Sequence, residues 1–408
     1  MTQDDPYLRF CEERQAAHQF RRLVASEIVP EGRVRRDGQT LINFASNDYL
    51  GLSQHPVLIE RAREAAARYG AGTTASRLIT GNHPLYETIE SKLAKGKGTE
   101  AALVMASGYQ TNLTILAALA DESVVGKPVT ILADRLSHHS LLQGATLSGA
   151  RRLRYNHNDY SRLELLLQKQ NEQKTQPIIV TESVFGMDGD CADLGILTAL
   201  ATRYGAMLYV DEAHATGIMG AGGFGLCATH KTDIAMGTFG KALGGFGSYI
   251  ACRSVLRDYL VQRCGGLVYS TALPPMVLGA MDAALDLLPT LDAPRARVAA
   301  EAERLRVALR SMGWNCGASV THIIPVILGS EEAATQLADH LRHHGILAPA
   351  IRPPTVPRGT SRLRLSLSAA HSAEDIDHLI TVMKQVPSPL MGEGQGGGET
   401  SRADSPCV

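Results

Sequence analysis

A lysine and an aspartate each follow a short apolar run in the middle of this 408-residue sequence. Lys241 lies in T-F-G-K-A-L-G-G-F-G, where glycines leave space around its amine, and Asp211 ends the earlier run L-Y-V-D. On neighbouring strand ends, this pair suits pyridoxal phosphate: the lysine forms an imine, and the carboxylate keeps a proton on the pyridine nitrogen. A single lysine in a glycine-rich loop would instead be expected to face solvent, so the prediction rests on the pair.

Two further features could hold the phosphate of such a cofactor. The run 101–107 leads into S-G-Y-Q-T-N, where a helical pattern begins. Free backbone N–H groups at a helix start bind phosphate, and Gly108 lets the anion approach closely. Thr238, three residues before Lys241, offers a hydroxyl. Taken alone, S-G-Y-Q-T-N is explained equally well as an ordinary helix cap.

Three other motifs suggest different chemistry and fail on their context. V-D-E-A-H (210–214) also matches the Mg²⁺-binding strand of helicases, but none of the three Gly-Lys pairs is followed by Ser or Thr, as a phosphate loop requires. G-A-G-G-F-G (220–225) fits a dinucleotide fingerprint, but no helical pattern follows it at once. His138 and His139 are adjacent without a carboxylate at ligand spacing, so we expect no metal.

The spacing of apolar residues indicates the elements that position these groups. Dense apolar runs alternate with helical patterns, which predicts a mostly parallel α/β sheet with ligands at the carboxyl ends of its strands. After a helical stretch at 274–290, an α+β pattern follows. The predicted strands are 101–107, 129–134, 177–183, 207–213 and 234–240, then 322–328 and 362–368, and the predicted helices include 10–28, 294–311, 331–344 and 372–385.

These patterns divide the chain into four predicted parts. Residues 1–54 form an N-terminal helix and extended segment, and residues 55–290 form the large cofactor-binding domain. Residues 291–386 form a small α+β domain. The end, 387–408, is rich in Gly, Ser and Pro and is expected to be disordered.

Composition narrows the class of protein. The net charge is −1, which gives no electrostatic footprint for nucleic acid or a membrane surface. No apolar run is long enough to span a bilayer, and the first residues are unlike a secretory signal. The seven cysteines are scattered and never form C-x-x-C, so we expect reduced packing residues in a cytoplasmic protein.

A set of segments, in order along nearly the whole chain to about residue 386, resembles the α-oxoamine synthases. These are pyridoxal-phosphate enzymes of the aspartate-aminotransferase fold, fold type I. The resemblance implies a mostly parallel sheet in a large domain, a smaller α+β C-terminal domain, and a homodimer with shared active sites. The segments are N-F-A-S-N-D-Y-L-G-L (43–52), S-G-Y-Q-T-N (107–112), A-D-R-L-S-H-H-S-L-L (133–142), V-T-E-S-V-F-G-M-D-G-D (180–190), V-D-E-A-H-A-T-G (210–217), T-F-G-K-A-L-G (238–244), Y-S-T-A-L-P-P (269–275) and R-L-R-L-S-L-S-A-A-H (362–371).

The resemblance implies a role for each cofactor-side residue. Lys241 is the Schiff-base lysine and, once freed by substrate, a base for the α-proton. Asp211 pairs with the pyridine nitrogen, His214 bonds to the phenolic oxygen, and His138 stacks on the ring. The phosphate contacts are Gly108, Tyr109, Thr238 and, from the other subunit, Thr271.

On the substrate side, the resemblance implies that Arg364 binds the amino-acid carboxylate through a two-bonded fork, with Arg362 as the alternative. Asn47 and Ser76 lie near the amino acid, and Ser76 leaves room for the methyl group of alanine. Arg21 and Thr355 contact the acyl substrate.

One residue departs from the family. Gly186 stands where the family usually has a serine that bonds to the cofactor's ring oxygen. We expect the loss of one hydrogen bond, about 0.5–1.5 kcal/mol, and therefore predict that Gly186→Ser tightens the cofactor.

Within the family, segment 351–367 most resembles members that condense L-alanine with a pimeloyl thioester, carried on coenzyme A or on acyl-carrier protein. The alternatives are a member that uses glycine or another acyl thioester, and a non-catalytic partner subunit. Retention of Lys241 argues against the last, because inert subunits lose that lysine.

Overall fold

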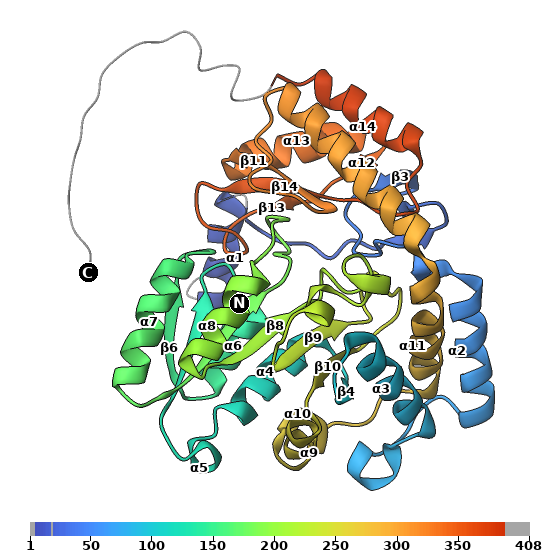
Figure 1. Cartoon of the computed structure of the whole chain (residues 1–408). Helices are drawn as coiled ribbons and strands as arrows, with labels where there is room; N and C mark the ends of the chain where they lie inside the picture. The colour runs from blue at the N-terminus through green and yellow to red at the C-terminus, as the bar shows by residue number, and fades with distance from the viewer. Residues whose placement is uncertain (1–4, 18, 388–408) are drawn as a thin grey trace, which may run out of the picture.

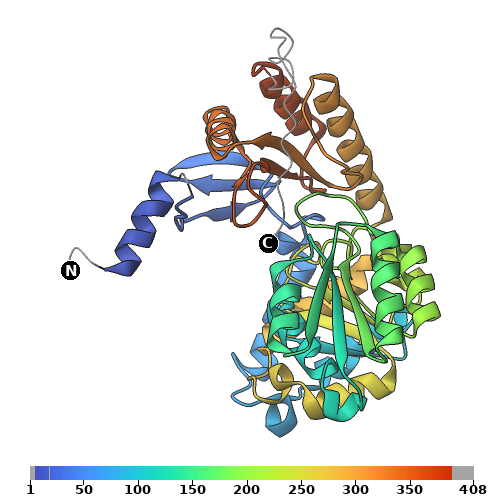
Figure 2. The ribbon, with the colours of Figure 1, turned by 90° about the vertical axis from the view of Figure 1, so that its left-hand side faces the viewer.

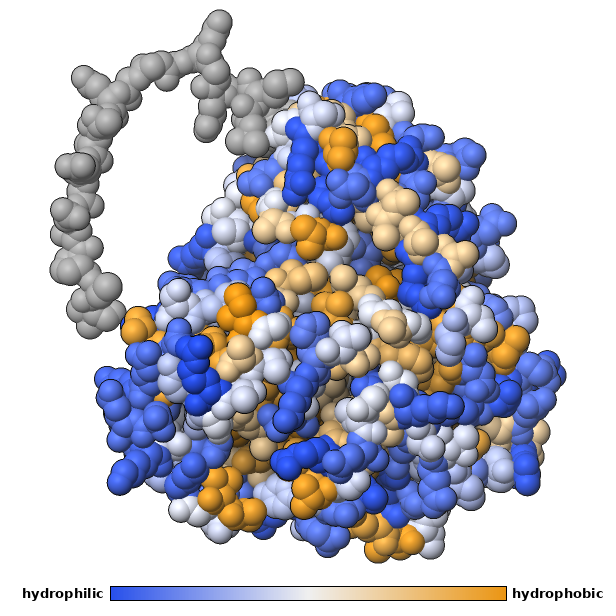
Figure 3. Space-filling model, in the orientation of Figure 1, coloured by the Kyte–Doolittle hydropathy of each residue, from blue (hydrophilic) through white to orange (hydrophobic). Residues whose placement is uncertain are grey.

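The computed structural model describes residues 5–17 and 19–387, which form two lobes (Figure 1). The larger lobe surrounds a seven-stranded sheet. The smaller lobe lies above it in that view and combines the C-terminal elements between residues 292 and 384 with an N-terminal segment. The first helix, α1 (Pro6–Ala16), projects away from both lobes (Figure 2). Hydrophilic residues cover most of the face seen in Figure 3, and the hydrophobic residues on it form small separate groups.

The central sheet has the order β4-β10-β9-β8-β7-β5-β6 and is mostly parallel. Only β10 among these strands runs antiparallel to its two neighbours, β4 and β9. The strands are β4 (Ala101–Met105), β5 (Val129–Asp134), β6 (Arg151–Tyr155), β7 (Gln176–Glu182), β8 (Met207–Asp211), β9 (Ile234–Thr238) and β10 (Ser248–Cys252).

Both faces of this sheet are covered, which explains why its strands are apolar without alternation. Alternate residues such as Leu103 and Ile131 pack under α4, α6 and α9. On the other face, Val104 packs with α2, α3 and α11, and Leu132 with α7 and α8. The helices are α2 (Pro56–Tyr69), α3 (Pro84–Lys97), α4 (Gly108–Leu119), α5 (Glu122–Val125), α6 (His139–Leu147), α7 (Tyr160–Glu172), α8 (Leu194–Tyr204), α9 (Ser254–Arg263), α10 (Gly265–Val268) and α11 (Pro275–Leu287).

The smaller lobe has two sheets with a common core. Strand β12 pairs with β3, so the N-terminal segment joins the C-terminal one, and Phe44 packs against the buried face of the C-terminal strands and helices. The sheets have the orders β1-β2-β3-β12 and β11-β14-β13. The elements are β1 (Glu27–Val29), β2 (Arg33–Arg36), β3 (Gln39–Asn43), α12 (Asp292–Ser311), β11 (Ile323–Gly329), α13 (Glu331–His343), β12 (Ile346–Leu347), β13 (Ala350–Ile351), β14 (Ser361–Ser366) and α14 (Ala373–Lys384).

The predicted helix at 10–28 is wrong in position and length. Asp5 accepts hydrogen bonds from the backbone N–H groups of Tyr7 and Leu8, and a proline occupies the first turn, so the helix begins at Pro6. It ends at Ala16, and residues 20–26 have no regular structure before β1 begins. The charged sequence of this region lacks an apolar stripe that would fix the boundaries of a helix.

Two strands of the central sheet were not predicted from the sequence. Strand β6 is a charged edge strand, R-R-L-R-Y, and β10 is a short run in a glycine-rich region. The tail predicted to be disordered lies outside the described residues from 388 onward. The proposed domain boundaries remain a prediction.

Two absences hold for the described part of the chain. Within residues 5–17 and 19–387, no helix is long and apolar enough to cross a membrane. The six cysteines in these residues are free thiols.

Candidate active site

A cavity of about 190 Å³ opens at the carboxyl ends of the parallel strands of the large lobe. Asp211 ends β8, and Lys241 lies in the loop between β9 and β10. Because β10 runs antiparallel to β9, this loop is a hairpin connection that keeps Lys241 at the carboxyl end of β9. The cavity is lined by Gly108, Tyr109, Asn112, His138, Ser140, Glu182, Asp211, Ala213, His214, Met236, Thr238 and Lys241.

Lys241 is the centre of a line of polar contacts. Its Nζ lies 2.7 Å from Nε2 of His214, whose Nδ1 lies 2.7 Å from the hydroxyl of Tyr49. Burial lowers the pKa of Lys241 to about 8, although the charges of Asp211 and Glu182 oppose this. Burial, with the nearby Lys241, also holds the pKa of His214 well below its usual value. A neutral histidine therefore contacts an amine that can lose its proton near neutral pH.

Asp211 is fixed by donors on both of its oxygens. Oδ2 accepts from Nδ2 of Asn112 at 2.8 Å, and Oδ1 accepts from the backbone N–H of Ala213 at 2.8 Å. Asn112 is itself held by the hydroxyl of Tyr209, which donates to its Oδ1 at 2.7 Å. A carboxylate clamped in this way can face a pyridine nitrogen without reorganising.

His138 and Glu182 form another side of the cavity. His138 is the N-cap of α6. Its Nδ1 lies 2.7 Å from Oγ of Ser140, and its backbone N–H donates to Oε1 of Glu182 at 2.6 Å. Burial lowers the pKa of His138, so the ring is neutral at neutral pH. Burial, reinforced by the charge of Asp211, raises the pKa of Glu182 to about 8.

The first turn of α4 suits a phosphate. Ser107 caps the helix by accepting from the backbone N–H of Gln110 at 3.3 Å, while Gly108 and Tyr109 line the cavity. A Cβ added at Gly108 would meet nothing closer than Met236, at 3.7 Å, so the glycine leaves the helix end open. With the amine of Lys241 and the carboxylate of Asp211, the residues present fit pyridoxal phosphate.

Arg364 connects the small lobe to this site. From β14 its guanidinium donates to Oδ1 of Asn47 at 3.1 Å and to the hydroxyl of Tyr49 at 3.1 Å. Arg362 instead donates to Oδ1 of Asp188 at 2.5 Å and to the carbonyl of Met187 at 3.3 Å. Arg362 therefore already has an anionic partner, whereas the acceptors of Arg364 are neutral.

Six predicted residues lie outside the cavity lining: Asn47 and Arg364, whose contacts are described above, and four others. Ser76 and Thr271 pair with each other in a β-bridge, and the cavity lining formed by the described residues includes neither. Arg21 donates to Oγ1 of Thr355 at 2.9 Å, which brings the two acyl-side residues together, again outside the cavity lining. Within one chain, Ser76 and Thr271 therefore belong to a different surface from Lys241.

Three site residues were not singled out from the sequence. Tyr49 lies between His214 and Arg364, Asn112 holds Asp211, and Glu182 holds the backbone of His138. Each lies in a segment that carries the family resemblance, and each is polar and buried. A polar residue expected in the interior next to a predicted site residue was the signal that could have found them.

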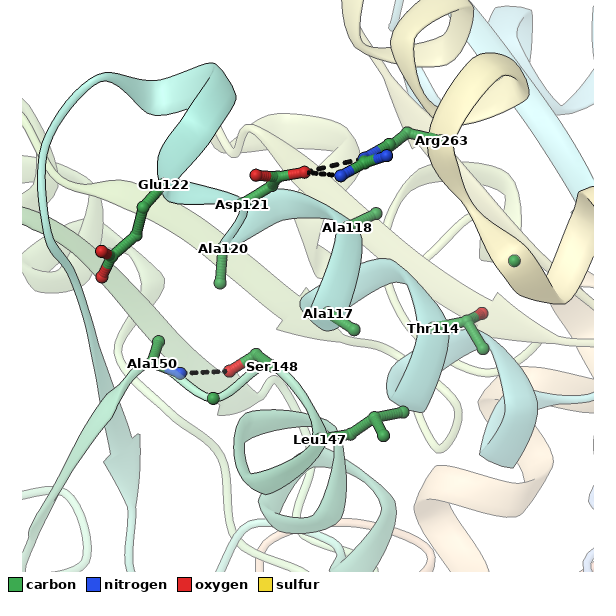
Figure 4. Close-up of a pocket in the computed structure, with 12 residues that line it drawn as sticks. Thr114, Ala117, Ala118, Ala120, Asp121, Glu122, Leu147, Ser148, Ala150 and Arg263 are labelled. Atoms are coloured by element: carbon green, nitrogen blue, oxygen red, sulfur yellow. Dashed lines mark hydrogen bonds and ion pairs between the residues drawn. The ribbon is translucent and has the colours of Figure 1, made fainter.

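A second hollow is larger than this site. A hollow of about 550 Å³ lies at the other end of α4, near Ala117 and Ala120 (Figure 4). Its main charged pair, Asp121 and Arg263, is satisfied internally, and Oε1 of Glu122 accepts from the backbone N–H of Val129 at 3.1 Å. Its small side chains and paired charges offer no reactive group.

The fold and the cavity define a pyridoxal-phosphate enzyme of fold type I. The chain belongs to the family described as aminotransferase class I and II, which matches residues 39–383. Within this family it is a pyridoxal-phosphate-dependent acyltransferase.

Named relatives cover nearly the whole chain. A Magnetococcus marinus protein, provisionally named 8-amino-7-oxononanoate synthase, is 53% identical over 371 residues, 90% of this chain and 94% of its own. The 8-amino-7-oxononanoate synthase of Gluconacetobacter diazotrophicus is 49% identical over 389 residues, 94% of this chain and 98% of its own. The solved serine palmitoyltransferase of S. paucimobilis, with bound PLP and myriocin, has a TM-score of 0.85 at 26% identity, covering 93% of this chain and 96% of that one.

Proposed function

We propose that the chain is an 8-amino-7-oxononanoate synthase of biotin biosynthesis. It would join L-alanine to a pimeloyl thioester of coenzyme A or acyl-carrier protein, releasing CO₂ and the thiol. Segment I-R-P-P-T-V-P-R-G-T-S-R-L-R-L-S-L (351–367) resembles this member, and relatives at about half identity carry its name. The proposal is carried by one structural observation, the continuous line of contacts from Lys241 through His214 and Tyr49 to Arg364.

The two ends of that line match the two ends of an α-amino acid. Arg364 can bind the carboxylate through a fork of two hydrogen bonds, exchanging its present neutral acceptors for a charged one. The amino group is then directed toward Lys241, since Tyr49 and His214 separate the two cations. The substrate would thus be oriented by buried side chains before any reaction.

Pyridoxal phosphate, when bound, supplies a ring that accepts electron density from the α-carbon of an attached amino acid. Asp211 is placed to hold a proton on the pyridine nitrogen. Lys241 is placed to remove the α-proton through Nζ, and its pKa of about 8 suits a base that works near neutral pH. His138 would cover one face of the ring and exclude water from it.

We further infer that the enzyme acts as a cytoplasmic homodimer. Ser76 and Thr271 pair with each other outside the cavity lining of their own chain, which is consistent with their reaching the site of a second copy. The runners-up keep the cofactor and change a substrate: glycine for alanine, or another acyl thioester. The remaining alternative, a non-catalytic partner subunit, is disfavoured because Lys241 is present and lines the cavity.

The test of function is a product assay over a small grid. Alanine, glycine and serine are each combined with pimeloyl, succinyl and palmitoyl thioesters of coenzyme A and, for the pimeloyl group, of carrier protein. We expect 8-amino-7-oxononanoate from alanine and a pimeloyl thioester to be the dominant product. Dominance of a glycine or serine product would reject the biotin assignment and keep the family.

The attachment of the cofactor gives a separate prediction. Borohydride reduction of the loaded protein should fix the cofactor to one peptide, the one containing Lys241, as read by mass spectrometry. Lys241→Ala should abolish this label and the product, whereas Lys95→Ala, at an exposed lysine on α3, should leave both intact. Labelling of any other lysine in the wild type would overturn the assignment.

A further inference from the structure

His322 is a buried histidine whose ring nitrogens have no role in the proposed reaction. It directly precedes β11, at the start of the small-lobe sheet, and only 2% of its surface is exposed. Neither ring nitrogen has a hydrogen-bond partner among the described residues. Burying such groups without partners costs about 1–3 kcal/mol each. We therefore looked for a contact of His322 that could offset this cost in stability.

The ring of His322 packs directly against Tyr49. The two ring centroids are 4.1 Å apart, and the planes meet at 66°, an edge-to-face arrangement that is favourable for aromatic rings. Tyr49 is fully buried, so its ring can be fixed only by such packing and by its hydroxyl. His322 is therefore part of the wall that sets the direction of the Tyr49 hydroxyl.

That hydroxyl has three polar partners that belong to different parts of the site. It lies 2.7 Å from Nδ1 of His214, 3.0 Å from Oδ1 of Asn47, and 3.1 Å from Nη2 of Arg364. A small rotation of the tyrosine ring would lengthen at least one of these contacts. The position of Tyr49 thus controls how His214, beside Lys241, lies relative to Arg364.

The charge state of His322 is consistent with a packing role. Burial lowers the pKa of His322 to about 3, and the charges of Arg364 and Lys241 act in the same direction. A third cation in this position would oppose the other two. The ring remains neutral and acts by shape.

We propose that His322 is a positioning residue, which holds Tyr49 so that its hydroxyl contacts His214 and Arg364 together and thereby sets the affinity for the amino-acid substrate. This inference rests on the proposed role of Arg364 as the carboxylate ligand. It assigns the small lobe a function in recognising the amino acid beyond supplying the arginine itself.

The test compares three variants of the loaded enzyme. His322→Ala removes the ring, and His322→Phe keeps an aromatic ring without nitrogens. His371→Ala is the matched control, because His371 is also a buried small-lobe histidine but packs on Phe44, with ring centroids 4.3 Å apart, and its ring is not among those in contact with the ring of Tyr49. The dissociation constant of the amino acid is read from the absorbance of the cofactor, and the affinity of the apoprotein for pyridoxal phosphate and the melting temperature are measured alongside.

We expect His322→Ala to weaken amino-acid binding about tenfold, and His322→Phe to stay within about threefold of the wild type. His371→Ala should lower the melting temperature without changing the dissociation constant. Unchanged binding in His322→Ala would overturn the proposal. Equal losses in His322→Phe and His322→Ala would also overturn it, since the nitrogens and not the packing would then matter.

The wild type separates this inference from the proposed function. If alanine fails to bind but glycine or serine binds, the proposed substrate is wrong, and the three variants are compared with the amino acid that binds. If no amino acid of this panel binds the loaded wild type, both the function and the role of His322 are rejected.

Discussion

Position 186 shows how a single missing side chain reshapes its surroundings. A Cβ added to Gly186 would lie 2.3 Å from Nε2 of His214, too close for any real contact. His214 cannot easily move away, because Tyr49 and Lys241 contact its two nitrogens. The prediction that serine would strengthen the site assumed free space, and the structure contradicts that assumption.

Gly186→Ser should therefore weaken binding of pyridoxal phosphate by about tenfold, roughly 1.4 kcal/mol. The reason is displacement of His214 from Lys241. Titration of the apoprotein with the cofactor measures the effect, and Gly186→Ala is the matched variant, with the Cβ but no hydroxyl. The steric explanation fails if the Gly186→Ser protein binds the cofactor more tightly than the Gly186→Ala protein and as tightly as the wild type. The hydroxyl would then compensate for the added Cβ.

The sequence predicted the reactive residues better than the residues that hold them in position. Lys241 and Asp211 could be chosen because their chemistry is visible in the residue type, and the family resemblance added His138; all three line one cavity. Tyr49 could not be chosen in this way, because its importance comes from contacts with residues far away in the chain. Which of Arg362 and Arg364 faces the site depended on Asp188, a partner in another lobe.

At the scale of elements, a buried ion pair fastens the segment that follows β8. Lys97, at the end of α3, pairs with Glu212, and both side chains are almost fully buried. The other oxygen of Glu212 accepts from the backbone N–H of Cys227 at 2.8 Å. One carboxylate thus closes the loop from 212 to 227, whose first residues lie next to Asp211 and His214.

Lys97→Met should destabilise the protein by about 3–5 kcal/mol, because it leaves a buried carboxylate without its counter-charge. Urea unfolding of the apoprotein measures the change. The double variant Lys97→Met, Glu212→Gln should recover part of the loss. If the double variant loses as much unfolding free energy as the two single variants lose together, the pair does not act as a unit.

Strand positions followed from the sequence where apolar residues were dense. The apolar runs became β4, β5, β7, β8 and β9, although β4, β8 and β9 each end two residues earlier than predicted. Strand β10 was missed because five residues between glycine-rich and charged segments carry too little pattern. The N-terminal helix was misplaced because α1 buries no residue, so no apolar face marked its limits.

At the scale of the whole molecule, a histidine ties the strand loops of the large lobe together. His157 lies 3.1 Å from Oδ1 of Asp134 and 2.6 Å from Oδ2 of Asp190. Beside Asp190, the carbonyl of Gly189 accepts from the hydroxyl of Thr321 in the small lobe, at 2.9 Å. The cluster therefore links the loop that leads to His138 with the junction between the lobes.

This cluster predicts how stability depends on pH. Although burial opposes it, hydrogen bonds to Asp134 and Asp190 raise the pKa of His157 to about 10. The folded pKa lies above the unfolded value of about 6.5, so the stabilisation is complete below that pH and is lost as the pH rises through about 10.

His157→Asn should lower the free energy of unfolding by at least about 1–2 kcal/mol at pH 6. The difference from the wild type should shrink toward pH 10, measured by urea unfolding across that range. A difference that stays constant with pH would show that the charge of His157 contributes nothing.

The placement of Ser76 gives a prediction for the assembly. If a second chain brings Ser76 to the amino-acid site, Ser76→Thr should shift the preference from alanine toward glycine by about tenfold, since the added methyl meets that of alanine. The measurement is the ratio of kcat/KM for the two amino acids at a fixed pimeloyl thioester. An unchanged ratio would place Ser76 outside the site in the dimer as well.

The position of β4 at the end of the central sheet affects how the chain can be made. All five of its residues are buried, and within the described residues its sheet partner is β10, whose first residue is Ser248. During synthesis on the ribosome, this apolar strand emerges long before the strand that will cover it. Until β10 has been synthesised, β4 therefore lacks its strand partner. Partly folded chains with unpaired strands of this kind are commonly bound by chaperones. A polypeptide that stops before residue 248 would keep that edge exposed and should aggregate.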